Sequence, residues 1–514
     1  MTEKSKPSIS LCMIVKNEEH FLGQCLESVR EFVDEMIIVD TGSTDKTVEI
    51  AKQFGAKVHF HQWQNSFSEA RNFSLQFVSG DWVLQLDADE KLERKDIPLL
   101  KKVISDPHTN AVFMPILNDL PGGGISKHYF PRLYRRGSAH YEGIVHNQLE
   151  FTGKSVTAEI RIYHYGYNLM PEQMAKKNER SARLLEKQLE ENPDFLFAWH
   201  NLIRIHRNEK KYDLVMQEAD AVLNRIPYEQ DVAAYVMIAY DAASSAYQKG
   251  LYQRAEKYCL NAIEKMPDYL DIFYVLGCVR MGMKRHKAAI VEFKKALAIL
   301  ENLRQKPALT QLKLDVFNSE HLIHKHIAIC YFSLGNKKEA QDSLEQAIQK
   351  KPEYSEGHYL LGALFLEENS SESAAREFAR VLETDPEHIG ALVNMAVVAV
   401  RQDRFYAAKQ YLVKIADRDD IDPDLYHVLG ELCTRIKEFR LGIDFYEKYL
   451  QKRPQQIGVL TNIASCYAQL GNYQAAVLGY QSVLEIDPGN ELARKNLLEL
   501  GRYLQKHKSE IVFA

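Results

Sequence analysis

The chain has 514 residues, of which 46% are hydrophobic and 26% are charged, as in an ordinary globular protein. This length exceeds what one hydrophobic core supports, so two or more domains are expected. The formal net charge of −5 provides no basic surface, which disfavours nucleic acid or an anionic membrane as the main partner.

Nothing in the sequence resembles a membrane anchor. No window reaches the roughly 18 apolar residues of a membrane span. The first apolar run, ISLCMIV, is too short for a signal peptide and is interpreted as a strand. The seven cysteines are scattered without zinc or CxxC spacing, so we expect reduced, buried thiols in a cytoplasmic protein.

Residues 8–165 alternate short apolar strands with helical stretches. Strands are predicted at ISLCMIV, EMIIVD, KVHFHQ and DWVLQLD, and helices at residues 18–32, in KTVEIAKQFG and in FSEARNFSLQFV. This alternation predicts a parallel sheet covered by helices, in which ligands bind at the carboxyl ends of the strands. The glycine-rich PGGGIS, residues 121–126, is predicted as a connector or a flexible lid.

An acidic cluster follows the last of these strands. In GDWVLQLDADE, a buried strand leads directly to Asp87, Asp89 and Glu90. In a solvated loop their repulsion would cost little. A divalent cation bound together with phosphate oxygens would also resolve it, and Mg²⁺ and Mn²⁺ prefer such oxygen ligands. Because the cluster ends a buried strand beside other polar loops, the cation is the favoured interpretation.

Polar segments also end the neighbouring strands. MIVKNEE brings Glu18, and VDTGSTDKT brings Asp40 before a glycine turn. Residues 43–45 are explained as caps of the next helix, whereas Asp40 precedes the turn and is not. FSEARN supplies Arg71, which could contact a phosphate or base in the same cleft or form a surface ion pair.

From about residue 171 onward, small residues recur with a period of 34. One series is Ala328, Gly362, Ala396, Gly430 and Ala464, and prolines at 352, 386, 454 and 488 close the same period, with Asp420 at the missing place. A helix-turn-helix unit of this length resembles the tetratricopeptide repeat, whose stacked units form a solenoid.

These patterns predict the domain organisation. Between Gly277 and Ala328 the spacing is one period plus 17 residues, so an insertion is expected near residues 302–318. We expect a catalytic domain at 1–170, a linker helix and degenerate repeat at 171–228, a solenoid at 229–489, and a capping helix and tail at 490–514.

Together, MIVKNEE, VDTGSTDKT, FSEARN and DADE resemble the nucleotide-sugar domain of family 2 glycosyltransferases. FPRLYRRG, YEGIVHNQLE and IYHYGYN are typical of the branch that carries tetratricopeptide repeats and includes bacteriocin peptide S-glycosyltransferases. The resemblance implies an α/β GT-A fold, Rossmann-like with a mostly parallel sheet, followed by an all-α solenoid.

The resemblance also implies roles for single residues. Contacts to the base and ribose are implied for Val15, Glu18 and Asp40, and closure of the nucleotide pocket for Arg71. Asp87 is expected near the ribose and metal. Thr41 replaces the second Asp of the frequent VDDGS form, which weakens the expectation of direct uracil recognition there.

The metal and the general base complete the expected site. Asp89 is implied as a direct metal ligand and His164 as a third ligand, although a histidine on a short aromatic strand could equally be packed in a core. Inverting enzymes of this family deprotonate the acceptor with one general base. Glu142 and His146 are both candidates, and Asn147 stands where relatives carry Glu.

The expected enzyme is a metal-dependent, inverting hexosyltransferase that uses Mn²⁺ or Mg²⁺ and a nucleotide-diphosphate sugar, with UDP-hexose as the first candidate. Its acceptor would be a peptide or protein held in the repeat groove. One alternative acceptor is a cell-surface polysaccharide or lipid-linked glycan. Another alternative is a non-catalytic repeat scaffold. A homodimer formed through repeat surfaces is also compatible with the sequence.

Overall fold

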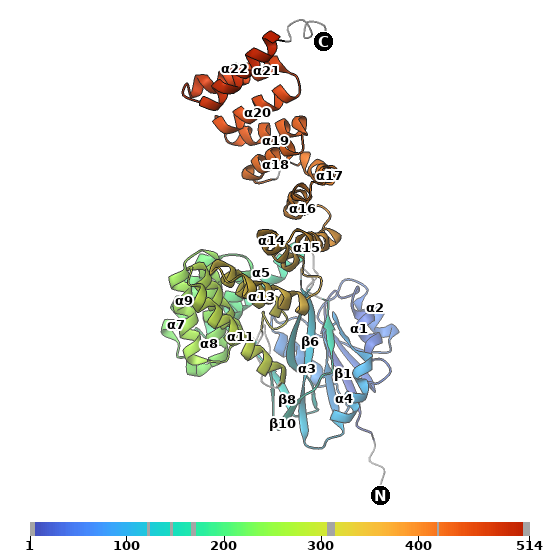
Figure 1. Ribbon diagram of the computed structural model, residues 1–514. Coiled ribbons are helices and arrows are strands. Elements are labelled where there is room, and N and C mark those ends of the chain that lie inside the picture. The colour runs from blue at the N-terminus through green and yellow to red at the C-terminus, as the bar shows by residue number, and fades with distance from the viewer. Residues whose placement is uncertain are drawn as a thin grey trace. The chain divides into compact units, whose positions relative to one another are not determined.

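The computed structural model describes residues 6–120, 124–143, 148–165, 171–305, 314–418 and 421–506. These residues form two compact units, 1–334 and 335–514. Figure 1 labels their elements. Among the described helices, none is both long and apolar enough to cross a membrane.

The first unit begins with a nine-stranded sheet (Figure 1) in the order β3-β2-β1-β4-β7-β6-β11-β5, with β10 also paired to β6. The first four strands of this order are mutually parallel, as predicted. β7 then runs antiparallel to both β4 and β6, so the sheet is mixed beyond β4. The strands are β1 Ile9–Val15, β2 Glu35–Asp40, β3 Lys57–Phe60, β4 Trp82–Gln85, β5 Glu90–Leu92, β6 Thr109–Leu120, β7 Gly124–Arg135, β10 Lys154–Thr157 and β11 Ile162–His164.

Helices cover both faces of this sheet. One face packs β1 against α1 (Leu22–Val29) and α4 (Ile97–Ile104). The other face lies under α3 (Phe67–Leu75), and α2 (Thr47–Gln53) follows β2. α1 is shorter than the predicted 18–32, because residues 19–21 before it and 30–32 after it form turns instead of helix. The helices leave the carboxyl ends of β1, β2 and β4 along one edge.

Two hairpins complete the domain. Leu120 pairs with Gly124 across β6 and β7, which form a long antiparallel pair, and residues 121–123 of PGGGIS lie outside the described part. β8 (Ala139–Glu142) and β9 (Gln148–Phe151) form a separate two-stranded sheet.

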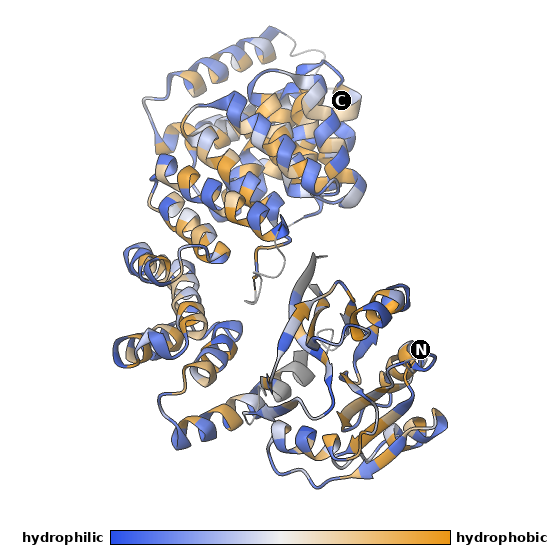
Figure 2. Ribbon diagram, turned by 90° about the horizontal axis from the view of Figure 1, so that it is seen from below, coloured by the Kyte–Doolittle hydropathy of each residue, from blue (hydrophilic) through white to orange (hydrophobic). Residues whose placement is uncertain are grey.

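Most of the remaining described residues of both units are in helices, and Figure 2 shows their hydrophilic and hydrophobic faces. Those of the first unit are α5 Pro171–Glu191, α6 Leu196–Asn208, α7 Tyr212–Arg225, α8 Val232–Gln248, α9 Tyr252–Lys265, α10 Leu270–Gly282, α11 His286–Gln305 and α12 Glu320–Ser333. Those of the second are α13 Lys337–Lys350, α14 Ser355–Glu367, α15 Ser371–Thr384, α16 Ile389–Arg401, α17 Phe405–Ala416, α18 Pro423–Arg435, α19 Phe439–Lys452, α20 Ile457–Gln469, α21 Tyr473–Ile486 and α22 Glu491–Lys506.

The periodic small residues lie where paired helices touch. A Cβ on Gly362 would lie 2.8 Å from the ring of Phe378, and one on Gly430 would lie 2.5 Å from the ring of Tyr446. Any side chain at these positions would force the two helices apart. The close helix contacts predicted from the 34-residue period are therefore confirmed at these two pairs, while Asp420 lies outside the described residues.

The segment predicted as an insertion, residues 302–318, begins within the last turn of α11, and residues 306–313 of it lie outside the described part. Its end is fixed to the repeats. The backbone N–H groups of Asp315 and Val316 donate to the Asp271 carboxylate, at 2.6 and 3.1 Å. The Asp315 carboxylate in turn accepts a hydrogen bond from Tyr240 at 2.9 Å.

Candidate active site at the carboxyl edge of the sheet

The ends of β1 and β2 form one wall of the site. Val15 and Asp40 are partners in the parallel ladder. Asp40 Oδ1 accepts hydrogen bonds from the N–H groups of Gly42 and Ser43, both at 3.0 Å, so the carboxylate shapes the turn. Its Oδ2 is buried without a hydrogen-bond partner. Most buried carboxylate oxygens are hydrogen-bonded, so this oxygen is free to accept a hydrogen bond from a water molecule or a ligand.

The loop after β1 is held against the loop after β2. The N–H of Asn17 donates to Ser43 Oγ at 2.9 Å, and the N–H of Glu18 donates to Thr47 Oγ1 at 2.7 Å. Asp45 accepts from the N–H of Thr47 at 3.0 Å near the start of α2. Glu18 therefore stands at the same edge as Asp40, on a loop fixed by backbone hydrogen bonds.

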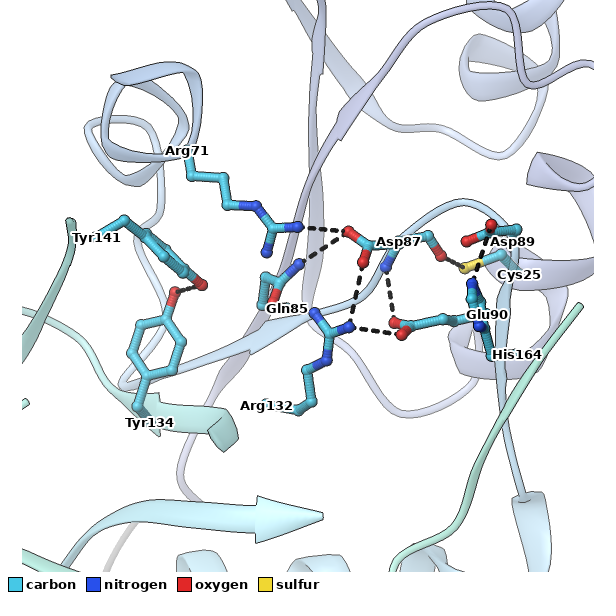
Figure 3. Close-up of polar contacts among 10 residues, drawn as sticks. All are labelled: Cys25, Arg71, Gln85, Asp87, Asp89, Glu90, Arg132, Tyr134, Tyr141 and His164. Carbon is cyan, nitrogen blue, oxygen red and sulfur yellow. Dashed lines mark hydrogen bonds and ion pairs between the residues drawn. The ribbon is translucent and has the colours of Figure 1, made fainter. Parts of the chain in front are cut away.

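Two arginines hold Asp87, at the end of β4. Figure 3 shows the Asp87 carboxylate between Arg71 of α3 and Arg132 of β7, with distances of 2.8 and 3.1 Å. Burial alone would raise the pKa of Asp87, but the two guanidinium charges outweigh it and hold the pKa well below its usual range. Arg71 is thus an internal partner of the acidic cluster, not a surface ion pair.

Arg132 also neutralises Glu90, which is 3% exposed. The guanidinium lies 2.5 Å from Glu90 Oε1, while Glu90 Oε2 accepts the Asp87 N–H at 2.9 Å. Gln85 accepts a hydrogen bond from Arg132 and donates one to Asp87 at 3.1 Å. The repulsion evident in the sequence is therefore balanced by two arginines of this chain.

Arg132 is not among the site residues predicted from the sequence. It lies in the quoted segment FPRLYRRG, where it alternates with the apolar Pro131 and Leu133. A charged residue at an alternating position of an apolar strand could have indicated a buried ion pair. Its partners follow only from the pairing of β7 with β4, which brings Arg132 to the acidic cluster.

Asp89 and His164 form the other end of the cluster (Figure 3), with His164 Nε2 3.1 Å from Asp89 Oδ2. The pairing of β11 with β5 joins them across 75 positions of sequence. His164 Nδ1 lies 2.7 Å from Asn118 Oδ1 on β6. Burial disfavours the imidazolium, but the hydrogen bond to Asp89 and the nearby carboxylates outweigh it and raise the pKa of His164.

The two facing atoms of this pair, a carboxylate oxygen and an imidazole nitrogen, are of types that bind divalent cations. An N–H at Nδ1 directed to Asn118 leaves Nε2 facing the carboxylate, which is the orientation that second-sphere partners impose on metal-binding histidines. Within the described residues, no cluster of three or more His, Cys, Asp or Glu side chains could hold an ion. The described residues thus offer one carboxylate and one imidazole here, and such an ion would need further oxygen ligands, of the kind that phosphate groups supply.

Of the two candidate general bases, the structure describes only Glu142. Glu142 ends β8 with an exposed side chain, 65% accessible, 2.9 Å from His140. Its neighbour Tyr141 points the opposite way, into the core beside Tyr134. His146 and Asn147 lie outside the described residues.

Known protein families match both the N-terminal domain and the helical repeats of the chain. Residues 10–156 match the family Glycosyl transferase family 2. Tetratricopeptide repeat families match residues 270–300, 328–389 and 457–490.

Three relatives illustrate the similarity. A TPR repeat-containing protein of Synechococcus elongatus is 35% identical over 198 residues, 36% of this chain and 49% of its own. The SPbeta prophage-derived glycosyltransferase SunS of Bacillus subtilis is 26% identical over 64% of this chain and 77% of its own. An uncharacterized glycosyltransferase of Rickettsia typhi is 29% identical over 37% of this chain and 72% of its own. The chain spans about half the length of the cyanobacterial relative.

The matched ranges contain the strands, motifs and helix pairs described above. The chain therefore combines a family 2 glycosyltransferase domain with C-terminal tetratricopeptide repeats.

Proposed function

We propose that the protein transfers a hexose, with inversion, from a nucleotide-diphosphate sugar to a peptide or protein acceptor held by its repeats. UDP-hexose is the first candidate donor. The proximity of Asp89 and His164, which come from different strands and lie 3.1 Å apart at the sheet edge, is the observation that carries this proposal. The two ring nitrogens of His164 meet polar side chains from two other parts of the sheet, Asn118 on β6 and Asp89 beside β5.

The nucleotide would lie along the ends of β1 and β2. Val15 and Glu18 would face the base and ribose, and the unpaired Oδ2 of Asp40 would accept an N–H of the base. Arg71 would close the pocket from α3. Asp87, engaged by two arginines, would support the ribose side of the pocket.

The metal would be held by Asp89 and His164, with Asn118 orienting the imidazole. Mn²⁺ or Mg²⁺ bound there would stabilise the negative charge of the departing diphosphate. The residues of the chain then have separate tasks: Asp89 and His164 bind the ion, whereas Arg132 compensates Asp87 and Glu90.

The acceptor side depends on Glu142 or His146 as general base. We further propose that residues 1–170 perform the chemistry and that the solenoid at 229–489 binds the acceptor. Stacked repeats present a groove suited to an extended peptide. The similarity to the glycosyltransferase SunS, which extends over 342 residues and so beyond the catalytic domain, supports a common architecture.

The test is turnover of UDP-, GDP- and dTDP-hexoses by the full chain, with Mn²⁺ or with EDTA. One donor should be hydrolysed only with the metal. Loss of the base should lower the rate by about 10²- to 10⁴-fold, so Glu142→Gln and His146→Ala identify it. No turnover and no binding of any donor would refute the proposal and leave the scaffold alternative. Mass spectrometry of candidate acceptor proteins then tests for a hexose increment.

A further inference from the structure

The sheet formed by β8 and β9 stands apart from the main sheet. Within the described residues, no backbone ladder joins it to the nine strands that carry the acidic cluster. It nevertheless carries Glu142 at the end of β8, so its position relative to the end of β4 matters for any reaction between donor and acceptor. Side chains of α3 bridge the two.

Asn72 provides the main bridge. Its Oδ1 accepts the N–H of Tyr141 at 2.8 Å, and its Nδ2 donates to the carbonyl of Tyr141, also at 2.8 Å. One side-chain amide thus reproduces the two hydrogen bonds that a neighbouring antiparallel strand would form. Ser68, four residues earlier and on the same face of α3, donates to the carbonyl of Gly143.

Arg71, the residue directly before Asn72, connects the same strand to the acidic cluster. Its guanidinium lies 2.8 Å from Asp87 and 5.4 Å from the ring centre of Tyr141. The hydroxyl of Tyr141 is 3.0 Å from that of Tyr134 on β7. Tyr141 is therefore held by its backbone through Asn72 and by its ring through Arg71.

We propose that Asn72 is a positioning residue that fixes the β8–β9 hairpin, and with it Glu142 and the backbone of Gly143, against the donor-binding strand end. This inference rests on the proposed function. Arg71 and Asn72 of FSEARN thus have different roles. Arg71 holds Asp87, and Asn72 holds the β8–β9 hairpin, which carries the candidate base Glu142. A displacement of about 1 Å between reacting groups can cost about 10²-fold in rate.

The test compares Asn72→Ala and Asn72→Asp with the wild-type full chain. Alanine removes both hydrogen bonds, whereas aspartate keeps an acceptor for the Tyr141 N–H but opposes its carbonyl with a second oxygen. Gln76→Ala, at the exposed end of α3, is the matched control. Hydrolysis of UDP-glucose with Mn²⁺ and calorimetric binding of UDP are measured for each, along with hydrogen exchange.

Both Asn72 variants should lower kcat at least 10-fold while KM and the UDP dissociation constant stay within 2-fold. Amide exchange should accelerate in residues 139–142 and 148–151 but not in 9–15 or 35–40. Gln76→Ala should match wild type in every measurement. If Asn72→Ala does not fold, Ser68→Ala carries the test, with a fall in kcat of about 3-fold.

Unchanged kcat, or unchanged exchange in the hairpin, would overturn the inference. A parallel loss of UDP affinity would also overturn it, because Asn72 would then support the donor pocket. If wild-type protein bound none of UDP, GDP and dTDP, the proposed function would fail, whereas the exchange comparison would still decide whether Asn72 holds the hairpin.

Discussion

Replacing Arg132 with methionine should destabilise the first unit strongly. The guanidinium lies 2.5 Å from Glu90, whose side chain is 2% exposed, and 3.1 Å from Asp87. Removing one partner of a buried ion pair leaves an uncompensated charge, which costs about 3–5 kcal/mol. That is a large part of the roughly 5–15 kcal/mol by which a domain is stable.

The assay is urea-induced unfolding, monitored by tryptophan fluorescence. All three tryptophans precede residue 335, so the signal reports on the first unit alone. Burial raises the pKa of Glu90, and loss of the Arg132 charge should raise this pKa further. A buried carboxyl with a raised pKa destabilises the folded state as it ionises, so the free energy of unfolding of the variant should fall more steeply than that of wild type as pH rises from 5 to 8.

The double variant Arg132→Met/Glu90→Gln removes both charges of the closest pair. It should recover at least about 1 kcal/mol relative to Arg132→Met alone, and it should lose the extra pH dependence. A single variant destabilised by less than about 1 kcal/mol, or a double variant no more stable than the single, would refute the view that Arg132 compensates a buried carboxylate.

Three further changes test other parts of the structure. Asn118→Ala should lower Mn²⁺ affinity about 10- to 100-fold, measured by calorimetry, because His164 loses the partner that orients its ring. Glu35→Gln should cost about 2 kcal/mol at pH 7. Burial opposes ionisation of Glu35, but hydrogen bonds from Ser10, Ser79 and Lys57 lower its pKa to about 2, so the difference should vanish as pH falls from about 4.3 to 2. Gly430→Ala should lower the melting temperature of the second unit, followed by circular dichroism, because its Cβ would meet the Tyr446 ring. Adding Tyr446→Leu should restore part of the loss, since Ala396 and Leu412, which occupy the corresponding positions 34 residues earlier, are buried in one hydrophobic cluster.

β1, β2 and β4 could be predicted from local sequence, because each is a short apolar run that ends at polar residues. The repeat period likewise located the helix contacts at Gly362 and Gly430, because a fixed spacing of small residues reflects a repeated packing constraint. These features depend on neighbours in sequence or on strict periodicity.

The arrangement of the acidic cluster depends on pairings that no local pattern encodes. Arg132 reaches Asp87 from 45 residues away, and only because β7 inserts antiparallel between β4 and β6. His164 lies on a three-residue strand, too short to give a periodic signal, and its pairing with β5 alone brings it to Asp89. The residue types of the site could be predicted, but not which acid meets which cation.

The central claim is that the carboxyl edge of the sheet binds a sugar nucleotide through a metal held by Asp89. The most direct measurement is calorimetric titration of UDP, GDP and dTDP into the full chain with Mn²⁺, with EDTA, and with Asp89→Asn. We predict that one nucleotide binds in Mn²⁺ and binds at least 10-fold more weakly in EDTA or to the variant. Equal binding under all three conditions, or no binding of any nucleotide, would contradict it.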